Sequence, residues 1–127
     1  MLVARFSSLG EHGLIWFGIA AATRRWDAAR SVAIAYGANQ VVKVIVRRRR
    51  PPQEGRRTST FSDLSYPSAH AATSVAGARR LSETLPAAPL WGLATALALS
   101  RLYLGVHYPS DTIAGAALGG AIAELTR

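Results

Sequence analysis

The sequence contains no cysteine. Its absence excludes disulfide bridges, thiolate metal sites and a cysteine nucleophile, although it leaves the cellular compartment open. Aromatic residues are also scarce, at 8% of the 127 residues, whereas alanine alone fills 24 positions. Because half of the residues are apolar and alanine is the best helix former, we expect closely packed helices and neither a sheet-rich fold nor a disordered chain.

Acidic residues are few as well. Asp and Glu number 7 against 15 Lys and Arg, which gives a formal net charge of +8. A partner of opposite charge is therefore favoured: a phosphate group, a nucleic acid or an acidic membrane surface. The length leaves room for one domain, residues 1–127, because domains commonly take roughly 100 to 200 residues.

Long apolar runs are missing. The first run, residues 13–23, has 11 residues, and a membrane-spanning helix needs about 20. The segment also fits a cleaved secretory signal, with Arg5 as its basic part and Ala20 and Ala22 at a cleavage site. Since Glu11 and His12 interrupt that pattern, we interpret residues 13–23 as a helix of the mature chain. His12 has no expected partner and is assigned a structural role.

The remaining pattern predicts helices only. Prolines and polar stretches delimit them, and residues 51–67 form a polar surface loop. Polar residues cluster toward the same helix ends, as happens when intramembrane polar groups build a site. We therefore expect an all-α fold, a compact membrane-embedded bundle of about five helices, at residues 13–23, 28–46, 68–85, 90–105 and 109–125.

Three clusters of residues could carry chemistry. The first is a polar stripe at steps of three and four, ending in an arginine tract: Tyr36, Asn39, Lys43, Arg47 and Arg50. Seven residues make about two helical turns, so Lys43 and Arg50 are expected on one helix face as a cationic clamp for phosphate. The alternative is a basic tract, residues 47–57, that binds acidic lipid or nucleic acid without chemistry.

The second cluster is the segment Pro67, Ser68, Ala69 and His70. Ser68 can cap a following helix, whose free backbone N–H groups then form an anion site, with His70 in the first turn. A plain serine cap with an incidental histidine is the alternative.

The third cluster comprises Arg101, after Ser100, and then His107 and Asp111. A carboxylate that holds one imidazole nitrogen leaves the other free to act as a nucleophile or base. The alternative is a purely structural His–Asp pair.

Together these clusters resemble the type 2 phosphatidic acid phosphatases, a family that includes bacterial acid phosphatases and vanadium haloperoxidases. The family pattern is Lys, six residues, Arg-Pro; then Pro-Ser-Gly-His; then Ser-Arg, five residues, His, three residues, Asp. Every spacing is kept here, and the one departure is Ala69 in place of glycine. The family uses a backbone N–H at that position, which alanine retains.

The resemblance implies a role for each residue. His107 would be the nucleophile that forms a phosphohistidine, Asp111 would orient it, and His70 would protonate the leaving group and later activate water. The phosphate would be held by Lys43, Arg50, Ser68, the Ala69 amide and Arg101, with no metal ion and no cofactor. The reaction would be hydrolysis of the phosphomonoester or diphosphate of a membrane lipid.

The resemblance also implies a location and partners. The chain would be an integral protein of a bacterial cell membrane that binds a lipid phosphate and no nucleic acid, with a second copy of itself as a further candidate partner. More narrowly, residues 10–12 and 98–111 look like short actinobacterial members that dephosphorylate decaprenyl-phosphoryl phosphoribose. The alternatives are a soluble acid phosphatase, a haloperoxidase-like enzyme, a silent lipid-binding relative, and a non-catalytic basic protein that binds lipid or nucleic acid.

Overall fold

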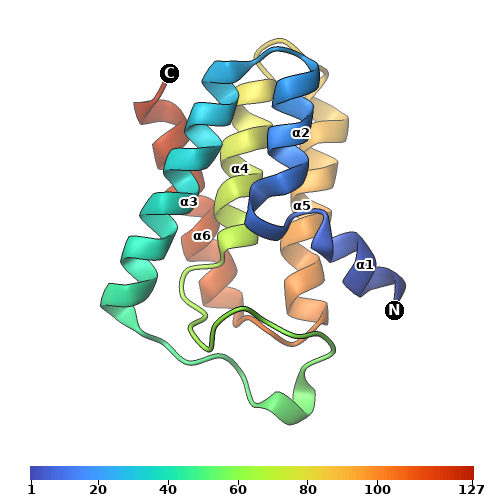
Figure 1. Cartoon of the computed structure of the whole chain (residues 1–127), viewed down its shortest axis with the longest axis vertical. Helices are drawn as coiled ribbons and strands as arrows, with labels where there is room; N and C mark the ends of the chain where they lie inside the picture. The colour runs from blue at the N-terminus through green and yellow to red at the C-terminus, as the bar shows by residue number, and fades with distance from the viewer.

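A computed structural model describes residues 1–127 and confirms the all-helical prediction (Figure 1). There is no β-strand, and the only β-type backbone pairing is an isolated antiparallel bridge between Arg49 and Leu64. The α-helices are α1 (Leu2–Ser8), α2 (Leu14–Ala22), α3 (Trp26–Val46), α4 (Ala69–Leu81), α5 (Ala87–Tyr103) and α6 (Pro109–Leu125), with short 3-10 turns η1 (Glu11–Gly13) and η2 (Gln53–Gly55).

Three differences from the expected elements exceed two residues. Helix α1 was not predicted, because seven residues without a side-chain cap leave no clear signal. Helix α4 ends at Leu81, four residues early. Helix α5 begins three residues before Leu90 and includes Pro89, which is tolerated because the first N–H groups of a helix have no intrahelical partner.

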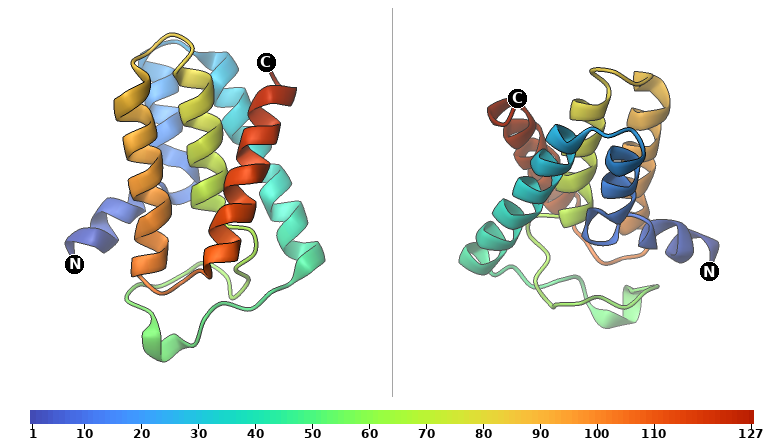
Figure 2. Two further views of the ribbon diagram at one scale, coloured as in Figure 1. Left: turned by 180° about the vertical axis from the view of Figure 1, so that it is seen from behind. Right: turned by 45° about the horizontal axis from the view of Figure 1, so that its top comes forward.

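Helix α4 lies at the centre of the bundle, between α3, α5 and α6 (Figure 2). The α4–α6 contact is close enough that a Cβ at Gly119 would collide with the carbonyl oxygen of Ala72. Trp16 of α2 is fully buried against α4, where its indole nitrogen donates to the Ser74 hydroxyl at 3.0 Å. Small residues and one large aromatic ring thus bring the helices together.

The segment between α3 and α4 crosses one end of the bundle (Figures 1 and 2). At that end, α3 and α5 finish and α4 and α6 begin. We call it the loop end. The bundle's other end is held by ion pairs, in which Asp27 accepts from Arg25 at 2.8 Å and from Arg80 at 2.7 Å.

The expected membrane embedding has no counterpart in helix hydropathy. None of the helices combines the length and the apolar character that crossing a bilayer requires.

Candidate active site

The third sequence cluster lies at the loop end, where His107 precedes α6. Both His107 and Asp111 are buried. The Nδ1 atom of His107 lies 3.4 Å from Oδ2 of Asp111, and a guanidinium nitrogen of Arg50 lies 3.3 Å from Nε2. The imidazole is therefore held between a carboxylate and a cation.

This arrangement determines the tautomer of His107. Because a guanidinium only donates hydrogen bonds, Nε2 must accept and carry the lone pair. The proton of the neutral ring then sits on Nδ1, which faces Asp111. Burial lowers the pKa of His107 to about 4, against the opposing effect of Asp111, so the ring is neutral at pH 7.

Asp111 is itself fixed by two donors. The Tyr108 backbone N–H donates to Oδ2 at 2.8 Å, which ties the carboxylate to the first turn of α6. Arg48 donates to Oδ1 at 2.9 Å and also contacts the Ser110 hydroxyl at 2.6 Å. The sequence analysis missed Arg48 as an individual residue, since nothing in an arginine tract shows which member turns inward.

The second cluster begins α4. Ser68 is the N-cap, its hydroxyl accepting from the Ala71 N–H at 3.3 Å, and its own N–H donates to the Asp111 carbonyl oxygen at 2.9 Å. The backbone N–H groups of Ala69 and His70 have no acceptor within the protein. Two free donors at a helix N-terminus suit an anion.

A residue of α1 completes this part of the site. Nε2 of His70 lies 2.9 Å from the carbonyl oxygen of Ser7, to which it must donate. Arg101 donates to the Ser7 hydroxyl at 3.2 Å. Ser7 is fully buried and thus holds a histidine and an arginine of two different motifs. Sequence reasoning missed Ser7, because only the packing of α1 brings it here.

The predicted clamp on a single helix face is wrong. Helix α3 ends at Val46, and Arg47 adopts a left-handed conformation with a φ of 56°. Lys43 therefore lies on α3, whereas Arg50 lies in the following segment. Arg50 donates to the Ser62 carbonyl oxygen at 2.7 Å, and Lys43 and Ser62 line the same cavity.

The basic tract is not a uniformly solvated face. Arg56 donates to the Pro51 carbonyl oxygen at 2.8 Å, and Arg57 stacks over Tyr103, 4.5 Å from the ring centroid. Burial and the neighbouring Arg101 lower the pKa of Arg50 to about 10. The crowding of cations shows that this end of the bundle favours an anionic ligand.

His12 does have partners, contrary to the expectation. Its Nδ1 lies 2.8 Å from the Tyr36 hydroxyl, and its ring centroid lies 4.8 Å from that of Phe61. The contact joins η1 to α3 and to the crossing segment, which the sequence separation had concealed.

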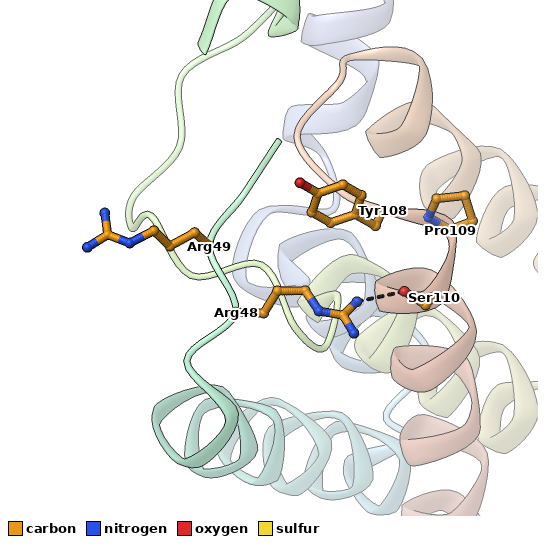
Figure 3. A pocket seen from close by; sticks show the side chains of 5 residues that line it. All are labelled: Arg48, Arg49, Tyr108, Pro109 and Ser110. Carbon is orange, nitrogen blue, oxygen red and sulfur yellow. Dashed lines mark hydrogen bonds between the residues drawn. The ribbon is translucent and has the colours of Figure 1, made fainter. Parts of the chain in front are cut away.

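A wide cavity of about 600 Å³ opens beside Tyr108 and Ser110, at the start of α6 (Figure 3). Figure 3 shows the Arg48 guanidinium directed at Ser110, whereas Arg49 points away. The remaining residues that line this cavity are Tyr108 and Pro109, which directly follow His107 in the chain. Neither here nor elsewhere do three His, Asp or Glu side chains converge into a metal-ligand group.

Comparison with known proteins identifies the family. Residues 24–127 match the model of the PAP2 superfamily. The chain belongs to this superfamily. It is therefore an enzyme, a lipid phosphatase, as the three motifs predicted.

Three similar proteins show how far the likeness extends. The decaprenylphosphoryl-5-phosphoribose phosphatase of Mycolicibacterium smegmatis is 43% identical over 122 residues, covering 86% of this chain and 67% of that protein. The protein of the same name from Mycobacterium tuberculosis (strain H37Rv) is 37% identical over 130 residues, covering 94% and 73%. A transmembrane PAP2-type phosphatidylglycerolphosphate phosphatase from Bacillus subtilis, known from a crystal structure, has the same fold, with a TM-score of 0.74 at 23% identity over 98% of this chain and 73% of that one.

Proposed function

We propose that this enzyme removes the phosphate of a lipid-linked phosphomonoester through a phosphohistidine formed on His107. One observation carries the proposal: the lone pair of His107 Nε2 faces Arg50, a cation that can turn to a bound phosphate, while Asp111 lies at Nδ1. A neutral imidazole whose basic nitrogen faces a phosphate-binding cation is a nucleophile in position.

In the first step, the Nε2 lone pair attacks phosphorus and the bond from phosphorus to the leaving oxygen breaks. In the free protein, burial and the neighbouring Arg101 lower the pKa of His70 to about 3. Once the negative charge of the bound phosphate offsets this and the ring is protonated, His70 gives its proton to that oxygen, so the product leaves as an alcohol. Asp111 stabilises the positive charge that develops on the His107 ring. Lys43, Arg50, Arg101 and the free N–H groups of α4 neutralise the phosphate oxygens.

In the second step, water attacks the phosphorus of the phosphohistidine. His70 accepts a proton from this water, and the phosphorus–nitrogen bond breaks. The electron pair returns to Nε2, and inorganic phosphate leaves. Both steps use one acid–base group on one side of phosphorus and one nucleophile on the other.

The same proposal places the enzyme at a bacterial membrane with a polyprenyl-phosphate-linked substrate. Large aliphatic side chains are exposed around the loop end, on the last turns of α3 and α5 and the first turns of α6: Val41, Val44, Ile45, Leu99 and Ile113. Exposed apolar residues near the end of the bundle that holds the site suit contact with lipid. The relatives from M. smegmatis and M. tuberculosis, named for such a substrate, support this choice.

The test is release of inorganic phosphate by detergent-purified protein in the presence of EDTA. The substrates are phosphatidic acid, phosphatidylglycerol phosphate, a polyprenyl diphosphate and a polyprenyl-phosphoryl pentose phosphate. We expect turnover with EDTA, its loss in His107→Ala, and a large decrease in Asp111→Asn. Asp63→Asn, an exposed aspartate on the crossing segment, is the matched control.

The intermediate is checked by quenching the reaction with labelled substrate. Label attached to the protein should be stable in alkali and labile in acid, as a phosphorus–nitrogen bond is, and absent from His107→Ala. Turnover by purified His107→Ala, or label that resists acid, would exclude the mechanism.

A further inference from the structure

A small cavity of about 100 Å³ lies on the His70 side of the site. Lys43, Ala69 and His70 line it, whereas His107 does not. Its other walls come from η1, the middle of α3 and the crossing segment, and the side chains that matter below are Glu11, Tyr36, Gln40 and Phe61. We call these four residues the leaving-group pocket.

The position of this cavity follows the direction of the reaction, and the argument rests on the proposed function. In phosphoryl transfer, the attacking and leaving atoms lie roughly in line on opposite sides of phosphorus. If His107 attacks and His70 protonates the leaving oxygen, the rest of the leaving group extends past His70. The cavity that contains His70 but excludes His107 is where it must go.

The lining of this cavity includes polar side chains with no partner, which an aliphatic leaving group would not require. The Glu11 carboxylate and the Gln40 amide form no hydrogen bond or ion pair with any protein group, although both side chains are partly buried. Unpaired planar acceptors and donors beside a reaction centre are suited to hydroxyl groups. Each would gain a partner only when a hydroxylated ligand is present.

An aromatic ring completes the pocket. Phe61 is 79% exposed, so the core does not hold it, and its contact within the site is the His12 ring at 4.8 Å. His12 is in turn anchored on Tyr36 at 2.8 Å. An aromatic face beside the two unpaired polar side chains matches the two surfaces of a sugar, its C–H face and its hydroxyl groups.

We propose that the leaving-group pocket binds the hydroxyl groups of a sugar, and that the enzyme therefore selects phosphate esters of a sugar hydroxyl. The pocket also disfavours a diphosphate. There the leaving group would itself carry a phosphate anion beside the unpaired carboxylate of Glu11, whereas Lys43, the cation of the same cavity, is engaged by the phosphate that is transferred.

The experiment compares kcat/KM on three substrates in one detergent: farnesyl-phosphoryl-ribose 5-phosphate, phosphatidic acid and farnesyl diphosphate. The leaving group is a sugar in the first substrate, the alcohol diacylglycerol in the second and farnesyl phosphate in the third. In Gln40→Ala, the ratio of the first to the second should fall about 10- to 100-fold, the effect of losing a hydrogen bond to a substrate hydroxyl. In Glu11→Gln, the same ratio should fall and the relative rate on the diphosphate should rise.

Matched controls lie on the exposed turn η2. Gln53→Ala and Glu54→Gln remove the same chemical groups at a distance from the cavity, so both ratios should stay within about twofold of those of the unmodified protein. Equal losses on all three substrates in the pocket variants would mean a structural role and would overturn the inference. Unchanged ratios would overturn it as well.

Failure of the inference can be told from failure of the proposed function. If the unmodified protein releases phosphate and His107→Ala does not, the mechanism stands and only the ratios decide on the pocket. If the unmodified protein releases none from any of the three, or if His107→Ala retains turnover, the proposed function is wrong and the pocket assignment falls with it.

Discussion

Gly10 lies directly against the edge of the His70 ring. A Cβ at position 10 would stand 2.8 Å from Cδ2 of His70 and 3.3 Å from its Nε2. The φ of Gly10 is −87°, which alanine adopts without strain, so Gly10→Ala tests steric contact alone. Ordinary contacts begin near 3.4 Å, and the ring must therefore move by about 0.6 Å.

That movement should be costly for both the reaction and the fold. His70 is held by its hydrogen bond to the Ser7 carbonyl oxygen, and a shift of the ring misdirects Nδ1, the nitrogen left for proton transfer. A misplacement approaching 1 Å can lower a rate about 100-fold. We expect kcat to fall about 10- to 100-fold and the free energy of unfolding to fall by about 1 to 3 kcal/mol, as for other overpacked sites.

The assay is phosphate release at saturating substrate, with thermal unfolding measured on the same preparations. Gly18→Ala is the matched control, because a Cβ there meets nothing within 4 Å. That variant should keep its kcat and gain about 0.5 to 1 kcal/mol of stability from the better helix propensity. A Gly10→Ala protein with the kcat of the unmodified enzyme would refute the placement of His70 at the reacting atoms.

Three other predictions concern His107, Arg48 and the α4–α6 contact. Since burial lowers the pKa of His107 to about 4, the acid limb of kcat/KM for this group should lie near pH 4, and an acid limb at pH 6.5 would contradict the buried neutral ring. The free energy of unfolding should also fall as the pH drops from about 6.5 toward 4, because the unfolded chain takes up the proton first. His107→Gln should flatten that decline. Arg48→Met removes a hydrogen-bond donor from Asp111 and should lower kcat about 10- to 100-fold. The Arg49 side chain makes no hydrogen bond, so Arg49→Met should leave kcat unchanged. Equal kcat values in the two variants would show that the Arg48 contact does not contribute to catalysis. Gly119→Ala should destabilise the protein by about 1 to 3 kcal/mol in denaturant unfolding, whereas Gly120→Ala, whose Cβ would meet only Val75 at 3.7 Å, should not.

The sequence predicted the parts of this protein that depend on local rules. Pro109 marks the start of α6, and Ser68 caps α4, because proline at a first helical position and serine at an N-cap are local preferences. Gly115 and Gly119 are four residues apart, a spacing that suits close helix approach, and a Cβ at either would meet a backbone oxygen, that of Ser68 or of Ala72. Short-range spacing was enough for these features.

What the sequence did not predict depends on how distant segments pack. Periodicity placed Lys43 and Arg50 on one helix face, but the left-handed Arg47 ends α3 between them. Ser7 and Arg48 carry no motif of their own and become part of the site only through contacts with His70 and Asp111. Pairings across 63 positions in the chain, as both of these are, leave no periodic trace in a single sequence.

The N-terminal segment gives the site its asymmetry. The family model begins at residue 24, yet Ser7 orients His70 and Arg101, Gly10 touches the His70 ring, and Glu11 lines the cavity beyond it. All three contacts fall on the leaving-group side, whereas the nucleophile side is built by α6 and the segment after α3. The family motifs can thus supply the attack on phosphorus, common to every substrate, while in our proposal Glu11, from before the family region, acts with Tyr36, Gln40 and Phe61 of that region on the choice of leaving group.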